Sequence, residues 1–180
     1  MATTVLLGAL LALLAWTALA FNRLVRRANL VREGWSGIDV QLARRHALVP
    51  NLVEVVQSYA SFEKQLLTDV TRLRAEGRAT RALQDQENAL SDRLRSVLAV
   101  AEAYPQLLAN KNFLRLQEQL AEIEDQLQMA RRYYNGTVRD YNTAAESFPS
   151  NLVASLFHFS TAEFFQIESA LARRAPEVNL

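Results

Sequence analysis

An uninterrupted apolar stretch lies near the start of the chain. Residues 3–21, TTVLLGALLALLAWTALAF, include no charged residue and no proline. As a helix these nineteen residues would be about 28 Å long, which is close to the hydrocarbon thickness of a bilayer. The pattern predicts a transmembrane anchor over residues 1–21.

Beyond the anchor, apolar residues recur at alternating steps of three and four, the spacing of helices that pack along one another. No stretch alternates with period two for long enough to form a strand. We therefore expect an all-α protein, in which a transmembrane helix continues directly into an antiparallel bundle of long helices over residues 22–175, followed by a tail at 176–180. The predicted apolar stripes are Val31, Trp35, Ile38, Leu42, Val49, Leu52, Val56, Tyr59, Leu66, Val70 and Leu73; then Leu83, Leu90, Leu94, Val97, Ala101 and Tyr104; then Phe113, Leu116, Leu120, Ile123, Leu127, Ala130, Tyr134, Val138, Tyr141 and Ala145.

Prolines, glycines and capping residues divide the stripes into helices. Pro50 lies inside the first stripe, so we expect a kink or short break near residues 46–50. The apolar spacing continues across Pro50, which favours a kink over two separate helices. Further boundaries are expected at Glu76–Thr80, Tyr104-Pro105 and Phe148-Pro149-Ser150, with Asn110 or Asn112 as a cap, and the S-x-x-E sequence Ser160–Glu163 predicts the start of a last helix.

A basic collar follows the apolar stretch, formed by Arg23, Arg26, Arg27 and Arg32. Positive residues on this flank favour a cytoplasmic body and a short N-terminus outside the cell. Anionic lipid headgroups are the simplest partners for these arginines. A cleaved signal peptide is the alternative, because Ala18-Leu19-Ala20 fits the small-x-small cleavage rule, but no basic residue precedes the apolar run.

Composition restricts the kinds of protein and of functional site that this chain could form. Half of the 180 residues are hydrophobic and 22% are charged, as in folded proteins. The net charge of +1 gives no indication of nucleic-acid binding, and the absence of cysteine excludes disulfides, thiolate nucleophiles and zinc–thiolate sites.

Catalytic and metal-binding motifs are missing from the sequence. His46 and His158 are far apart, and neither belongs to an E-x-x-H or H-x-x-x-H pattern. The acidic run at residues 118–125 is best interpreted as a solvated helix face. We therefore expect a protein that is not an enzyme and has no metal and no cofactor.

A set of polar residues beside the stripes is more informative. Arg45 occupies a core position of the first stripe, and a buried arginine needs a partner. Our candidates for a polar network between helices are Arg44, Arg45, Asn51, Arg132, Asn135 and Asn142. Such a network would fix the register of the helices. The alternative is a small-ligand site near Arg45, Asn135 and Asn142.

Several short segments together resemble the LemA family. They are WSGIDVQL at residues 35–42, Arg44-Arg45, LVPNLV at 48–53, AYP at 103–105, Phe113 with Leu116-Gln117, RRYYN at 131–135, Tyr141-Asn142 and Phe148-Pro149. The resemblance implies a bacterial membrane protein with one N-terminal span, a cytoplasmic helical bundle and no established catalytic residues. Members of the family are linked to membrane-organelle formation in magnetotactic bacteria, and others to antigen presentation or signalling.

Taken together, the sequence predicts a membrane-anchored helical scaffold at the inner face of the bacterial cell membrane. The third helix is expected to be longer than the second, so it would overhang, bend or pack against another copy. We therefore expect homo-oligomers, and contacts with other membrane proteins are a further expectation. The alternative function is a sensor or adaptor bundle that binds a small ligand.

Overall fold

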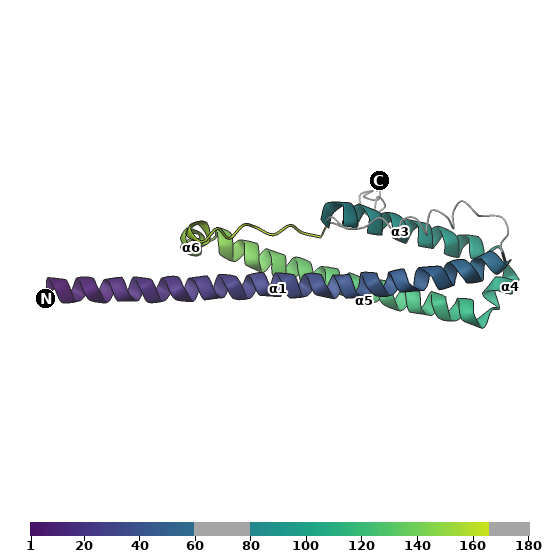
Figure 1. Cartoon of the computed structure of the whole chain (residues 1–180), viewed down its shortest axis with the longest axis horizontal. Coiled ribbons are helices and arrows are strands. Elements are labelled where there is room, and N and C mark those ends of the chain that lie inside the picture. Colours follow the sequence, from purple (N-terminus) through teal and green to yellow (C-terminus); the bar gives the residue numbers. More distant parts are fainter. Residues whose placement is uncertain (60–79, 166–180) are drawn as a thin grey trace, which may run out of the picture. The chain divides into compact units, whose positions relative to one another are not determined.

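The computed structural model describes residues 1–59 and 80–165. These residues form helices and no strand, which confirms the all-α class (Figure 1). The helices are α1 (Ala2–Tyr59), α3 (Thr80–Ala101), α4 (Pro105–Leu108), α5 (Lys111–Glu146) and α6 (Ser150–Leu156). The turn expected at Glu76–Thr80 falls almost entirely outside the described residues, as do the end of the first stripe and the tail at 176–180.

Helix α1 contains both the apolar stretch and the first part of the bundle stripe. Pro50 lies inside this helix, and the helix continues through it without the break that was one of the two expected outcomes. Val49 and Leu52 on either side of the proline are fully buried. Packing of the stripe therefore holds the helix together where proline removes a backbone hydrogen bond.

The chain divides into two compact units, which we describe separately. In the unit that includes Val40–Leu127, apolar residues of four helices form one core. Asn110 caps α5, because its side-chain oxygen accepts hydrogen bonds from the backbone N–H groups of Asn112 (2.8 Å) and Phe113 (3.2 Å). The core residues are Val49, Leu52 and Val56 of α1; Leu90, Leu94, Val97 and Ala101 of α3; Leu107 of α4; and Phe113, Leu116 and Leu120 of α5.

The other unit comprises Met1–Asp39 and Gln128–Phe164. Here α1 and α5 approach each other closely, because a Cβ atom on Gly34 would lie only 3.1 Å from the Cα of Tyr134. The rings of Trp35 and Tyr134 pack edge to face beside this point, with centroids 5.5 Å apart. Glycine at position 34 thus permits the contact between the two backbones.

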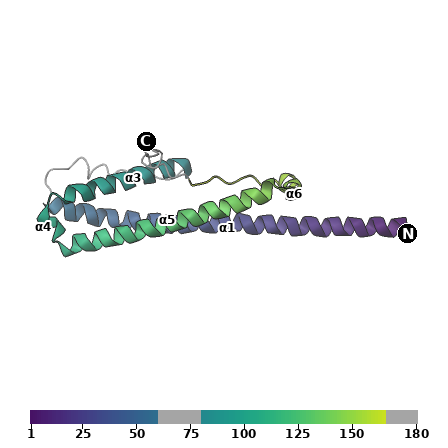
Figure 2. The ribbon, with the colours of Figure 1, turned by 180° about the vertical axis from the view of Figure 1, so that it is seen from behind.

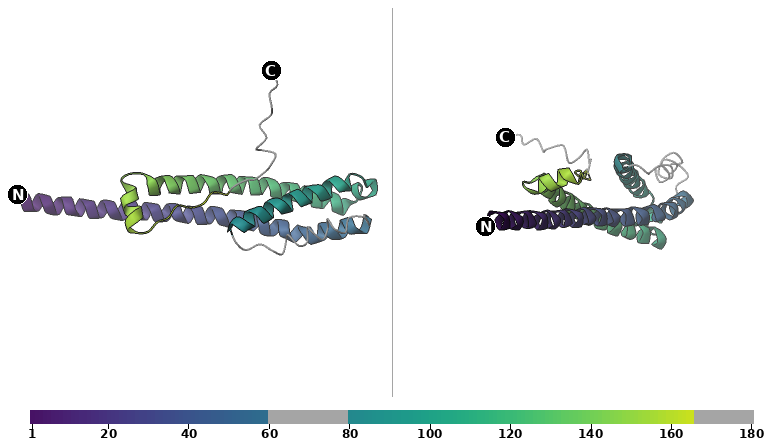
Figure 3. Two further views of the ribbon diagram at one scale, coloured as in Figure 1. Left: turned by 90° about the horizontal axis from the view of Figure 1, so that it is seen from above. Right: turned by 60° about the vertical axis from the view of Figure 1, so that its left-hand side comes forward.

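Helix α6 belongs to the same unit and lies across α1 (Figure 3). Its buried residues, Val153 and Ala154, share a small core with Leu24 of α1 and Ala145 of α5. Before this core the side chains of α1 are exposed from residue 1 to residue 16, and an 18-residue window of the helix has a mean hydropathy of 2.2. Within the described ranges α1 is the one helix long and apolar enough to cross a membrane.

The start of a last helix at Ser160–Glu163 was predicted wrongly. Residues 159–165 are not helical, and they run alongside α5 (Figures 1 and 2). The backbone groups that a helix would have used are bonded instead to side chains of α5, as described below. The remainder of the expected helix lies outside the described residues.

Candidate functional site

Arg45 is the centre of a buried charge cluster. Its side chain is fully buried, as its core position in the stripe predicts. One terminal nitrogen, Nη1, donates hydrogen bonds to Ser91 Oγ and Glu124 Oε1, both at 2.6 Å. The other, Nη2, donates to the carboxylate of Glu87 and to its backbone carbonyl at 3.2 Å. Helices α3 and α5 thus both supply partners for one guanidinium of α1.

Glu87 is the residue of this cluster that sequence reasoning missed. Its side chain is 2% exposed, and its second carboxylate oxygen lies 2.7 Å from His46 Nε2. The sequence did indicate this position, because Glu87 lies four residues after Leu83 and three before Leu90. This spacing makes position 87 a core position of the second stripe. Two core positions on neighbouring helices therefore carry opposite charges.

The surroundings of Glu87 favour its ionised form. Burial on its own would raise the pKa of the carboxyl group. Hydrogen bonding and positive charge from His46 and Arg45 outweigh that effect, so the pKa lies below its ordinary value of 4.5. The carboxylate is charged at neutral pH and balances the buried guanidinium.

A ladder of α5 side chains holds the segment at residues 159–164, which we call the strap. Tyr134 and Tyr141 donate their hydroxyls to the backbone carbonyls of Glu163 and Ser160, each at 2.8 Å. Burial raises the pKa of both tyrosines, so they remain donors well above neutral pH. The spacing of seven residues places both on one face of the helix.

Asn142 makes the two-point contact of this ladder. Its Nδ2 donates to the carbonyl of Ala162 at 2.9 Å, and its Oδ1 accepts from the N–H of the same residue at 2.8 Å. One amide side chain thus satisfies both backbone groups of Ala162, as a neighbouring strand would.

The candidate network residues lie in different environments. Among the described residues, Arg45 is bonded to residues 87, 91 and 124, and Asn142 is bonded to residue 162. Of the arginine pair at 131 and 132, the structure buries Arg131, which is 3% exposed. The other candidates are Arg44, Asn51 and Arg132, which are exposed, and Asn135, which is half-buried.

The acidic run has one member that is not simply solvated. Glu118, Glu122 and Asp125 are exposed, as expected, whereas Glu124 is 34% exposed and forms the ion pair with Arg45. His46 lies beside Glu87, and His158 is exposed with a φ of 57°. Within residues 1–59 and 80–165, no group of three His, Asp or Glu residues is arranged to hold a metal ion.

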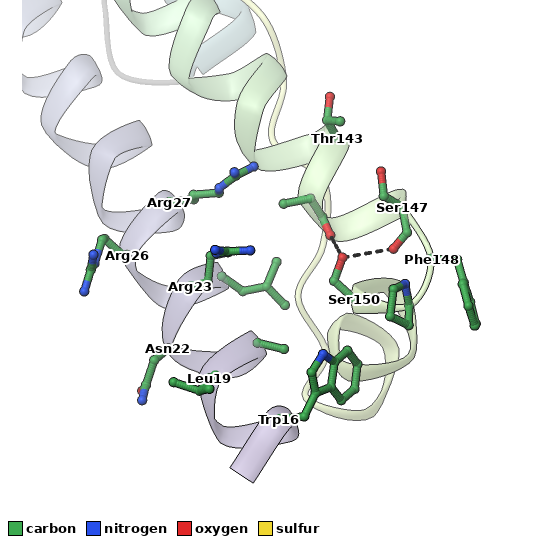
Figure 4. Close-up of a pocket in the computed structure, with 14 residues that line it drawn as sticks. Trp16, Leu19, Asn22, Arg23, Arg26, Arg27, Thr143, Ser147, Phe148 and Ser150 are labelled. Atoms are coloured by element: carbon green, nitrogen blue, oxygen red, sulfur yellow. Dashed lines mark hydrogen bonds between the residues drawn. The ribbon is translucent and has the colours of Figure 1, made fainter. Parts of the chain in front are cut away.

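The basic collar lies beside a cavity of about 790 Å³ within the unit that contains the apolar stretch (Figure 4). Arg23, Arg26 and Arg27 line it, together with residues 143–144 and 147–150. Arg27 Nη1 also donates a hydrogen bond of 2.6 Å to the backbone carbonyl of Asp140. Arg32 is exposed, and its charge acts on the hydroxyl of Tyr141.

The buried pair predicts the result of a double-mutant experiment. Arg45→Met should lower the free energy of unfolding by about 3–5 kcal/mol, because it leaves the carboxylate of Glu87 buried without its main partner. Adding Glu87→Leu to this variant should recover most of the lost free energy of unfolding. Chemical unfolding of the full chain in detergent measures both values, and Arg44→Met on the exposed neighbouring position is the control. A double variant less stable than Arg45→Met would contradict the pairing.

Acid should weaken the same cluster. The pKa of Glu87 is lower in the folded chain than in the unfolded chain, so its contribution is complete above pH 4.5 and is lost as the pH falls toward the folded value. The unfolding free energy should therefore fall more steeply with acidification in the wild type than in Glu87→Gln. Denaturant titrations from about pH 5 down to about pH 3 compare the slopes. Parallel slopes would show that Glu87 has an ordinary pKa.

The ladder predicts local exchange behaviour. Asn142→Ala removes both hydrogen bonds to Ala162, so the amide of Ala162 should exchange with solvent roughly tenfold faster. Hydrogen–deuterium exchange on the full chain measures this rate, with Thr143→Ala, the exposed neighbour, as the matched control. Unchanged protection in Asn142→Ala would mean that the strap is held by other contacts.

Comparisons with known proteins identify a family and several relatives of this chain. The LemA family model matches residues 34–180. The chain is 23% identical over 188 residues to magnetosome protein MamQ 2 of Paramagnetospirillum magneticum, covering 88% of this chain and 69% of that protein. It is 24% identical over 149 residues to protein LemA of Metamycoplasma hominis, covering 81% and 68%. With a family model matched over most of its length, and with an apolar helix suited to membrane association, the chain belongs to the LemA family.

Proposed function

We propose that this protein is a membrane-anchored scaffold that presents its helical bundle to partners at the inner face of the bacterial cell membrane. The observation that carries the proposal is the continuity of α1, in which the exposed apolar stretch and the fully buried Arg45 belong to one helix. The membrane segment therefore leads into the packed bundle without an intervening linker.

The orientation follows from charge. The four arginines of the collar lie on the C-terminal side of the apolar stretch. The positive-inside rule then keeps the bundle in the cytoplasm and the N-terminus outside. The likeness to MamQ, a protein named for the magnetosome, supports a role at a membrane.

Self-association is the first activity that we assign to the scaffold. Met129 and Tyr133 lie one turn apart on α5, and their side chains are 46% and 50% exposed. Exposed Met and Tyr are enriched at protein interfaces. We infer that this face of α5 contacts a second copy or another membrane protein, and the proposal includes no catalysed reaction.

The oligomeric state of the full chain tests this proposal. In detergent or nanodiscs, light scattering corrected for detergent and lipid should give a mass above one copy. The double variant Met129→Gln/Tyr133→Gln should shift the particle toward the monomer, whereas Arg139→Gln, at another exposed position of α5, should not. A wild-type protein that is strictly monomeric and purifies without partners would overturn the scaffold.

A further inference from the structure

Helix α6 and the residues beside it expose an unusual amount of apolar surface. Phe148, Leu152, Leu156 and Phe157 are 80%, 60%, 68% and 46% exposed, and we call these four residues the apolar foot. The opposite face of α6 is already buried through Val153 and Ala154. Four large apolar side chains within ten residues form the kind of patch that marks a membrane or protein contact.

The foot is attached where the membrane segment ends. The ring of Phe21, the last residue of the apolar stretch, packs edge to face on Phe157, with centroids 4.8 Å apart. It makes a second such contact with Phe159 at 5.6 Å. Since Phe21 marks the boundary between the apolar and basic residues of α1, the foot lies beside that boundary.

The cavity beside the foot is lined by both apolar side chains and arginines. Trp16 and Leu19 of the membrane segment line it, together with Phe148 of the foot. The side chains of Arg23 and Arg27 extend from α1 toward α5, as Figure 4 shows. An apolar wall next to two guanidinium groups matches a molecule that has an acyl chain and an anionic phosphate.

We propose that the apolar foot lies in the membrane interface and that this cavity binds the headgroup of an anionic phospholipid. The phosphate is held by Arg23 and Arg27, and the acyl chains lie along Trp16, Leu19 and the foot. The proposal rests on the membrane anchoring of the proposed function, and it adds a second contact with the bilayer and a preference among lipids.

Because the chain has no cysteine, single-cysteine variants of the full protein can report the depth of each position. Leu152→Cys reports the foot, Leu10→Cys reports the anchor, and Glu118→Cys reports an exposed position of the bundle. Each variant carries an environment-sensitive fluorophore and is reconstituted into vesicles of phosphatidylcholine with phosphatidylglycerol. Lipids spin-labelled near the headgroup should quench the label at 152, whereas the label at 118 should remain in water.

The two possible failures are distinguishable. If the label at 10 is quenched by deep spin labels and the label at 152 behaves like that at 118, the foot is overturned while the anchor stands. If the label at 10 also reports water, the membrane anchoring itself fails. Quenching at both 10 and 152, each at its own depth, supports the foot.

The lipid preference is tested by native mass spectrometry of the protein extracted from the same vesicles. Phosphatidylglycerol should be enriched over phosphatidylcholine on the wild type, and Arg23→Gln/Arg27→Gln should lower the enrichment by about fivefold per arginine. Arg23→Lys/Arg27→Lys keeps the charge and should retain most of it, and Arg44→Gln in the other unit should have no effect. The site would be overturned if the wild type retained the two lipids equally. It would also be overturned if Arg23→Gln/Arg27→Gln enriched phosphatidylglycerol as strongly as Arg44→Gln does.

Discussion

The ion pair between Arg45 and Glu87 constrains the register in which α3 packs along α1. Both side chains are almost completely removed from water, and transferring either charge alone into that environment would cost several kcal/mol. The charges are tolerated because Ser91, Glu124 and His46 add further polar contacts around them. A shift of α3 along α1 by one turn would separate the charges inside an apolar core, so the pair favours a single register of the two helices.

Much of this arrangement could be predicted from the sequence, because helical periodicity is a local signal. The stripes predicted the helices and the burial of Arg45. Predicting that Glu87 is the partner of Arg45 would have required knowing which helices are neighbours. Glu87 occupies a core position in the second stripe and was overlooked because it is polar. Conversely, Ala130 was assigned to the third stripe as the apolar residue, whereas Arg131 is the one that is buried. Periodicity identifies which positions of a helix face the core, but a search for hydrophobic residues misses the polar residues that occupy some of those positions.

The strap shows the opposite case, in which a local signal was overridden by tertiary contacts. Ser160–Glu163 has the residues of a capping box, which would favour a helix in isolation. In the folded chain, Tyr134, Tyr141 and Asn142 offer partners for its backbone, and these satisfy an extended segment instead. The tyrosine–asparagine pairs at a spacing of seven were visible in the sequence as a polar row. The strap backbone, to which these side chains bond, could not be identified from the sequence, because every residue has backbone donors and acceptors and they leave no pattern.

Composition and burial both change near the end of the apolar stretch of α1. By composition, the apolar stretch ends at Phe21 and the arginines begin at residue 23. By burial, the side chains of α1 are exposed from residue 1 to residue 16, Ala20 and Phe21 are partly buried, and Leu24 is the first that is fully buried, in a core with Ala145, Val153 and Ala154. An apolar helix that has no protein around it needs lipid, and one that is covered by other helices does not. Under the proposed membrane anchoring, the bilayer surface would lie near Phe21, where the rings of Phe157 and Phe159 pack against that residue.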